Sequence, residues 1–125
     1  MGNQVDHAVS AFIEDVHQRG LSEKILLVVT GEMGRTPRIN KNGGRDHYGN
    51  LTSLLVSGGG LKMGQVIGSS TKDGGEPASD RVTIPNLYAT LMEQLLDTGA
   101  VRSMAGIPNE VNTVISGASP IKQLL

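Results

Sequence analysis

The sequence predicts an α/β fold with a mostly parallel sheet, two strong strands and helices on either side of them. Two apolar runs, Ile25–Val29 and Leu51–Ser57, are typical of strands. An amphipathic segment precedes the first run, and another follows the second. Ile25–Val29 has no polar alternation, which favours a central strand of a parallel sheet over a half-exposed strand.

The first helix is predicted from apolar residues that recur at three- and four-residue spacing. These residues are Val5, Val9, Phe12, Ile13 and Val16. The spacing places them on one face of a helix of about four turns. Gly20 follows the pattern, where a glycine commonly ends a helix.

The second half of the chain predicts one further helix. Gln65–Gly68 is expected to be a short edge strand or hairpin piece, and Ser69–Asp80 an exposed, turn-rich loop. A helix is predicted to begin at Thr83, with a proline in its first turn, and to end near Asp97. Residues 101–125 show little periodicity and are expected to form an irregular C-terminal tail.

Size and composition exclude several classes of function. The 125 residues are enough for a single domain, 1–125, and the formal net charge of −1 gives no reason to expect nucleic acid. One phenylalanine and two tyrosines are too few for a base-stacking platform. No apolar run approaches the roughly 20 residues that span a bilayer, so membrane insertion is not expected. The N-terminus lacks the pattern of a signal peptide.

Two strands alone make a poorly stabilised sheet. We therefore expect Ile25–Val29 to have neighbours that this chain does not supply. Either the chain is part of a longer protein whose N-terminal part is missing here, or it is a homo-oligomer that borrows strands from a partner.

The stretch Ile25–Asn50 contains most of the residues that could carry chemistry. Glu32, Asp46 and His47 supply two carboxylates and an imidazole, which are ligand types of a divalent-metal site. In the structural alternative, Asp46 caps the following segment and His47 packs beside Tyr48.

Basic residues in the same stretch are candidates for binding an oxyanion. Arg35 and Arg45 are the two expected to bind substrate, because guanidinium groups fit phosphate and sulfate bidentately. Arg38 and Lys41 are further candidates. The alternative for any one of them is a solvated side chain on a basic loop.

Two short motifs then carry a resemblance to a known family. Residues 30–37 read TGEMGRTP and residues 44–48 read GRDHY. They resemble the paired signature (EFGRTP, then GRDHW) of a large bacterial family of unknown function that is sulfatase-like, within the alkaline-phosphatase superfamily. The resemblance implies a C-terminal portion of an alkaline-phosphatase-like three-layer αβα sandwich. It also implies a metal-dependent hydrolase of sulfuric or phosphoric esters, in a family often exported.

The resemblance assigns roles within the loop. Glu32 stands where that superfamily has a metal-ligand aspartate, and His47 where it has a later histidine. The implied cofactor is a divalent metal, either zinc, calcium or magnesium, and the implied ligand is a sulfated or phosphorylated small molecule or glycan. Met33 departs from the pattern, because it takes the place of a second ligand histidine.

No residue of this chain can be assigned as the nucleophile, so we expect the chain alone not to hydrolyse esters. The alternative function is a non-catalytic binding or structural domain that has lost the metal centre.

Overall fold

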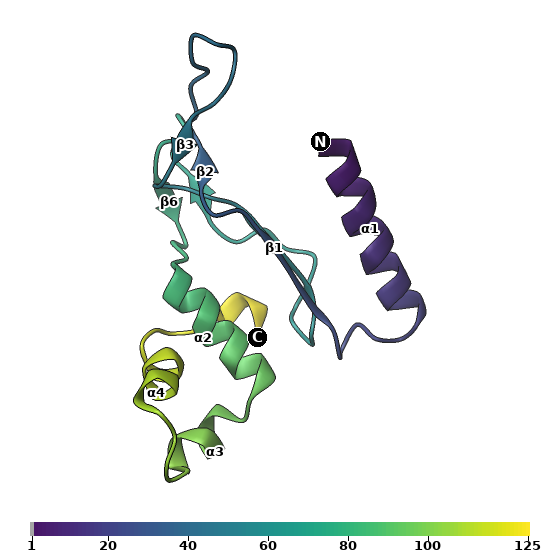
Figure 1. The fold of residues 1–125 in the computed structure, drawn as a ribbon, viewed down its shortest axis with the longest axis vertical. Helices are drawn as coiled ribbons and strands as arrows, with labels where there is room; N and C mark the ends of the chain where they lie inside the picture. Colours follow the sequence, from purple (N-terminus) through teal and green to yellow (C-terminus); the bar gives the residue numbers. More distant parts are fainter. Residues whose placement is uncertain (1) are drawn as a thin grey trace.

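The computed structural model describes residues 2–125, and it is an α/β structure in which every sheet is a pair of antiparallel strands (Figure 1). The pairs are β1 with β4, β2 with β3, and β5 with β6. The prediction of a mostly parallel sheet in a three-layer sandwich is therefore wrong. Both predicted strands exist, but they run in opposite directions.

The longest pair joins β1, Leu26–Thr30, to β4, Leu54–Gly58. Parallel neighbours need a crossover, usually a helix of a dozen or more residues, whereas antiparallel neighbours need only a chain reversal. Residues 31–53 contain no helix, and they fold back as a smaller hairpin. The missing helical periodicity of this segment was the signal for an antiparallel pair.

That smaller hairpin pairs β2, Gly34–Arg35, with β3, His47–Tyr48. The third pair joins β5, Ser69–Ser70, to β6, Pro77–Ser79, within the segment predicted to be an exposed loop. Gln65–Gly68, predicted as a strand or hairpin piece, has no regular structure.

Helix α1, Gly2–Gln18, confirms the first helix prediction, and Gly20 follows it with a positive φ of 65°. The helix lies to one side of the β1–β4 pair (Figure 1). Val16 is its one buried residue. Within residues 2–125, no helix is both long and apolar enough to cross a bilayer.

Helix α2, Ile84–Leu95, confirms the second helix prediction, with Thr83 as its N-cap. The irregular tail predicted for residues 101–125 is corrected, because the chain is largely helical there. Beyond α2 the structure has α3 (Thr98–Ser103), α4 (Asn109–Ser116) and the 3₁₀ helix η1 (Lys122–Leu124). These segments are too short for a clear period, and α4 gains its stability by packing against α2.

The C-terminal segment joins the helices to the sheet. Ile121 and Leu124 form a small buried cluster with Leu61, and part of the β1–β4 pair packs on this cluster. Thr90 of α2 is 1% exposed, and its hydroxyl oxygen accepts a hydrogen bond of 2.8 Å from the backbone nitrogen of Ile121. The core is therefore small, and it lies where α2, η1 and one face of the sheet meet.

The register of the β2–β3 hairpin depends on a glycine. Gly34 pairs with Tyr48, and a Cβ atom at Gly34 would lie only 1.7 Å from the carbonyl oxygen of Leu51. That oxygen belongs to the backbone, which cannot turn aside as a flexible side chain can. Only glycine fits at this position unless the hairpin shifts.

We predict that Gly34→Ala will destabilise the protein by about 2 kcal/mol or more, because the new methyl group must displace backbone. Gly49→Ala is the matched control in the same hairpin, since a Cβ there meets nothing within 4 Å. Urea unfolding measures both, and Gly49→Ala should stay within about 0.5 kcal/mol of the natural protein. Equal effects of the two substitutions would contradict this view of the register.

Candidate functional site

The candidate site is the β2–β3 hairpin with the loop between its strands. The hairpin lies at one end of the β1–β4 pair, and its loop projects beyond the other elements at the top of Figure 1. All five predicted site residues lie in or beside it. They are Glu32, Arg35, Arg45, Asp46 and His47.

Arg45 binds the hairpin's own backbone. Its Nη1 donates to the carbonyl oxygen of Thr36 at 2.7 Å and also to that of Pro37. Both acceptors lie on the opposite side of the loop, so the guanidinium group joins the two sides. Arg45, which was predicted to bind substrate, therefore bonds to the backbone of its own loop.

Asp46 is also used to shape the loop. Its Oδ1 accepts a hydrogen bond of 2.8 Å from the side-chain amide of Asn40. The backbone carbonyl oxygen of Asp46 accepts a hydrogen bond of 2.9 Å from the backbone nitrogen of Thr36. The backbone nitrogen of Asp46 donates one of 3.1 Å to the Thr36 hydroxyl. This side-chain contact lies within the loop, whereas the structural alternative had Asp46 capping the following segment.

Asn40 holds the tip of the loop. Its Oδ1 accepts hydrogen bonds of 3.0 Å from the backbone nitrogens of Asn42 and Gly44. These are the bonds by which an asparagine side chain typically closes a turn. The loop therefore has a defined shape although its residues are mostly exposed.

Arg35 and His47 are directly opposite each other in the β2–β3 register, and both are exposed. Residues opposite each other in an antiparallel pair have side chains on the same face, with Cβ atoms about 5 Å apart. Within residues 2–125, neither side chain makes a hydrogen bond or an ion pair. The hairpin thus presents a guanidinium and an imidazole side by side, facing solvent.

The predicted metal ligands are not assembled into a metal site by this arrangement. In the part of the chain that is described, no three His, Cys, Asp or Glu side chains are grouped closely enough to hold a metal ion. Glu32 lies before β2, and Asp46 bonds to Asn40. Metal binding by Glu32, Asp46 and His47 stays a prediction.

A second turn, residues 71–76, packs against the hairpin. The hydroxyl of Tyr48 donates to the carbonyl oxygen of Gly75 at 2.7 Å and accepts from the side-chain amide of Asn50 at 3.1 Å. The backbone of Gly74 lies beside the ring of Pro37. A segment predicted to be an exposed loop therefore supports the candidate site from one side.

Asp73 in this turn is held in its charged form. Hydrogen bonds from the Thr71 hydroxyl, at 2.6 Å, and from the Gly75 backbone nitrogen, at 3.2 Å, lower the pKa of its carboxyl group, and the positive charge of Arg38 lowers it further. The turn thus carries a fixed negative charge close to the base of the hairpin.

Three residues that shape this region were not among the predicted site residues, namely Asn40, Tyr48 and Asp73. The dipeptide Asp73-Gly74 is a common turn signal, and Asn40 precedes a pair of glycines at 43–44. Neither pattern shows which distant segment a turn contacts. The bond from Tyr48 to Gly75 joins residues 27 positions apart, and no local pattern could have found it.

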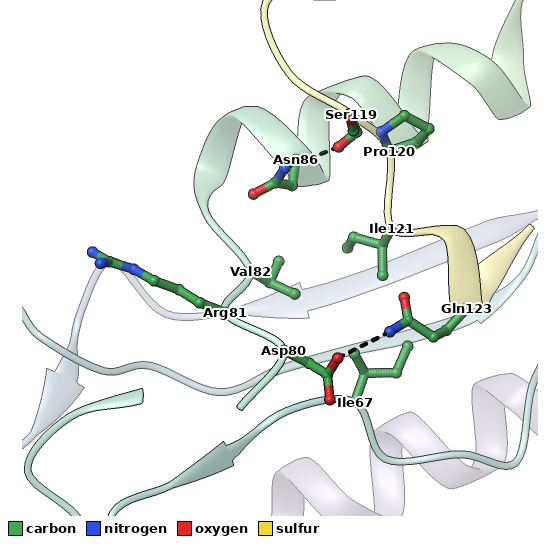
Figure 2. Close-up of a pocket in the computed structure, with 9 residues that line it drawn as sticks. All are labelled: Ile67, Asp80, Arg81, Val82, Asn86, Ser119, Pro120, Ile121 and Gln123. Carbon is green, nitrogen blue, oxygen red and sulfur yellow. Dashed lines mark hydrogen bonds between the residues drawn. The ribbon is translucent and has the colours of Figure 1, made fainter. Parts of the chain in front are cut away.

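The structure also has a small cavity of about 170 Å³ between the start of α2 and the C-terminal segment (Figure 2). Two pairs of its polar groups bond to each other, Asn86 to the Ser119 carbonyl oxygen at 2.9 Å and Gln123 to Asp80 at 3.3 Å. Figure 2 shows Arg81 extending away from the cavity. No predicted site residue lines it, so the hairpin remains the better candidate.

We predict that the Asp73 carboxyl group will titrate below the usual aspartate pKa of about 3.9. Because folding lowers this pKa, the stabilisation is present above the unfolded-state pKa and is lost as the pH falls through the folded-state pKa. Thr71→Val removes the largest cause and should raise the pKa toward the usual value, as measured by NMR of the carboxyl carbon.

Thr52→Val is the control for this titration, since within residues 2–125 the Thr52 hydroxyl donates only to the neighbouring Ser53 carbonyl oxygen. An Asp73 pKa that is unchanged by Thr71→Val, or equally changed by Thr52→Val, would contradict the assigned cause.

Comparison with known proteins gives one match. Residues 1–115 match the model of a family described as "Protein of unknown function (DUF1501)". No curated protein matches the chain, and no solved structure matches it. The resemblance to a sulfatase-like family of the alkaline-phosphatase superfamily is therefore corrected, because the family that matches is a different one. The match covers most of the chain, so the protein belongs to the DUF1501 family of unknown function.

Proposed function

We propose that this chain is a binding domain whose β2–β3 hairpin recognises the oxyanion of a sulfated or phosphorylated molecule through Arg35 and His47. The observation that carries the proposal is the division of roles within the hairpin. Arg45 and Asp46 bond to the loop itself, whereas Arg35 and His47 lie opposite each other without a protein partner in residues 2–125.

The chemistry of the pair suits an oxyanion. A guanidinium group presents several N–H donors in a plane that matches two oxygens of a phosphate or sulfate, and an imidazole N–H adds a donor beside it. Because Arg35 and His47 extend from paired strands, their spacing is set by the sheet and not by a flexible loop. Less conformational freedom is then lost on binding.

Hydrolysis of the bound ester is not part of this proposal. A hydrolase of the predicted type needs a nucleophile and a metal that polarises the ester. The described residues supply no assigned nucleophile, and they form no group of three metal ligands. We therefore expect the chain to bind such an ester without turning it over.

The experiment is an NMR titration of the full chain with inorganic sulfate, inorganic phosphate and an aryl sulfate at low ionic strength. Arg35→Ala should weaken binding about tenfold, because charge-assisted hydrogen bonds are worth about 1.5–3 kcal/mol and an exposed site is partly screened. His47→Ala should weaken it by a smaller factor.

Lys41→Ala is the matched control, since it removes the same charge from the same exposed loop but lies outside the Arg35–His47 pair. Arg35→Lys separates charge from geometry, and it should restore only part of the affinity. An equal loss in Lys41→Ala and Arg35→Ala would mean that binding depends on overall charge alone. Release of the phenol from the aryl ester, with or without added zinc, magnesium or calcium, would show that the chain hydrolyses the ester. That result would contradict the proposal that it only binds the ester.

A further inference from the structure

The chain exposes far more surface than a folded protein of its mass. Its accessible area is 9108 Å² for a mass of 13.1 kDa. The usual scaling of area with mass gives about 6,400 Å² for a monomer of this size, so the excess is about 2,700 Å². An excess of this size is larger than a small ligand or a short peptide can cover.

Part of the excess lies on the β1–β4 pair. Leu26 and Val28 share one face with Val56, and this face contacts the buried cluster around Leu124. Leu27 and Val29 alternate to the other face, where Val29 is paired with Leu55, which is 42% exposed. The outer edges of both strands also have no strand neighbour within residues 2–125.

Helix α1 contributes a second apolar surface. Of the five residues on its apolar stripe, only Val16 is buried, while Val5 is 55% exposed and Phe12 is 44% exposed. The helix lies beside the β1–β4 pair and is not packed along it (Figure 1). An amphipathic helix gains most of its stability by burying such a stripe. Most of the α1 stripe is not buried within residues 2–125, so α1 lacks a packing partner there.

We propose that these two surfaces, the α1 stripe and the outer face and edge of β1–β4, form the interface with a second copy of this chain. Together, these two surfaces are the open apolar face. Covering the excess of about 2,700 Å² on each of two chains would bury about 5,400 Å² in total, which is at the upper end for obligate homodimers, whose interfaces bury about 2,000 to 5,000 Å² or more in total.

Two further properties favour a second copy. A net charge of −1 means that two copies repel each other very little. A two-fold interface is self-complementary, so the free edge of β1 can pair antiparallel with β1 of the other copy and extend the sheet to four strands. The inference does not depend on the proposed oxyanion site, which lies on the hairpin.

Sedimentation equilibrium of the full chain, from about 1 to about 100 µM, tests this proposal. We expect a species of twice the 13.1 kDa chain mass that dissociates on dilution. Leu55→Glu and Phe12→Glu should each weaken association roughly a hundredfold or more, because each places an unpaired charge in the interface twice. Both positions are exposed in the monomer, so circular dichroism should show that the variants still fold.

Val66→Glu is the matched control, since Val66 is 94% exposed and lies outside the open apolar face. It should leave the dimer intact. A folded wild-type chain that remains a monomer at every concentration would overturn the proposal and leave the face to a different polypeptide. Open-ended aggregates, or a Val66→Glu variant that dissociates as fully as Leu55→Glu, would also overturn it.

Discussion

The close approach of the Gly34 backbone to the Leu51 carbonyl oxygen is the constraint on which the candidate site depends. It fixes the register in which Arg35 faces His47, and this register places Thr36 beside Asp46. A shift of one residue would turn every side chain of the hairpin to the other face. The chemistry available at the site therefore follows from a position that has no side chain.

The register also explains why similar residues have different roles. Arg35 and Arg45 have the same guanidinium group, and both are exposed. Arg45 lies within reach of two backbone carbonyl oxygens and binds them, whereas Arg35 faces an imidazole across the pair. Backbone acceptors exist at every residue, so residue type alone cannot tell which arginine meets one. For this reason the sequence predicted the polar loop, which the structure has, but could not separate the side chains that bond to the loop itself from those that do not.

The fold, like the candidate site, could be predicted only in part from the sequence. The long amphipathic patterns predicted α1 and α2, because the burial of one helical face repeats every three or four residues. The strands were located to within a few residues, but their direction was predicted wrongly. An uninterrupted apolar run shows that both faces of a strand avoid water, and it does not show what covers them. Leu55 illustrates this, because it is 42% exposed on a face that the predicted sandwich would have covered with helices.

We propose two different tasks for two parts of the chain, ligand binding at the β2–β3 hairpin and association at the open apolar face of α1 and the β1–β4 pair. The proposed role of Arg35 in binding is tested most directly by the NMR signals of the arginine Nε–H groups in the natural protein. On titration with sulfate, the Arg35 signal is expected to shift and saturate while the Arg45 signal changes little. Equal shifts of the two, or a larger shift of Arg45, would contradict the assignment of Arg35 to the ligand and of Arg45 to the loop.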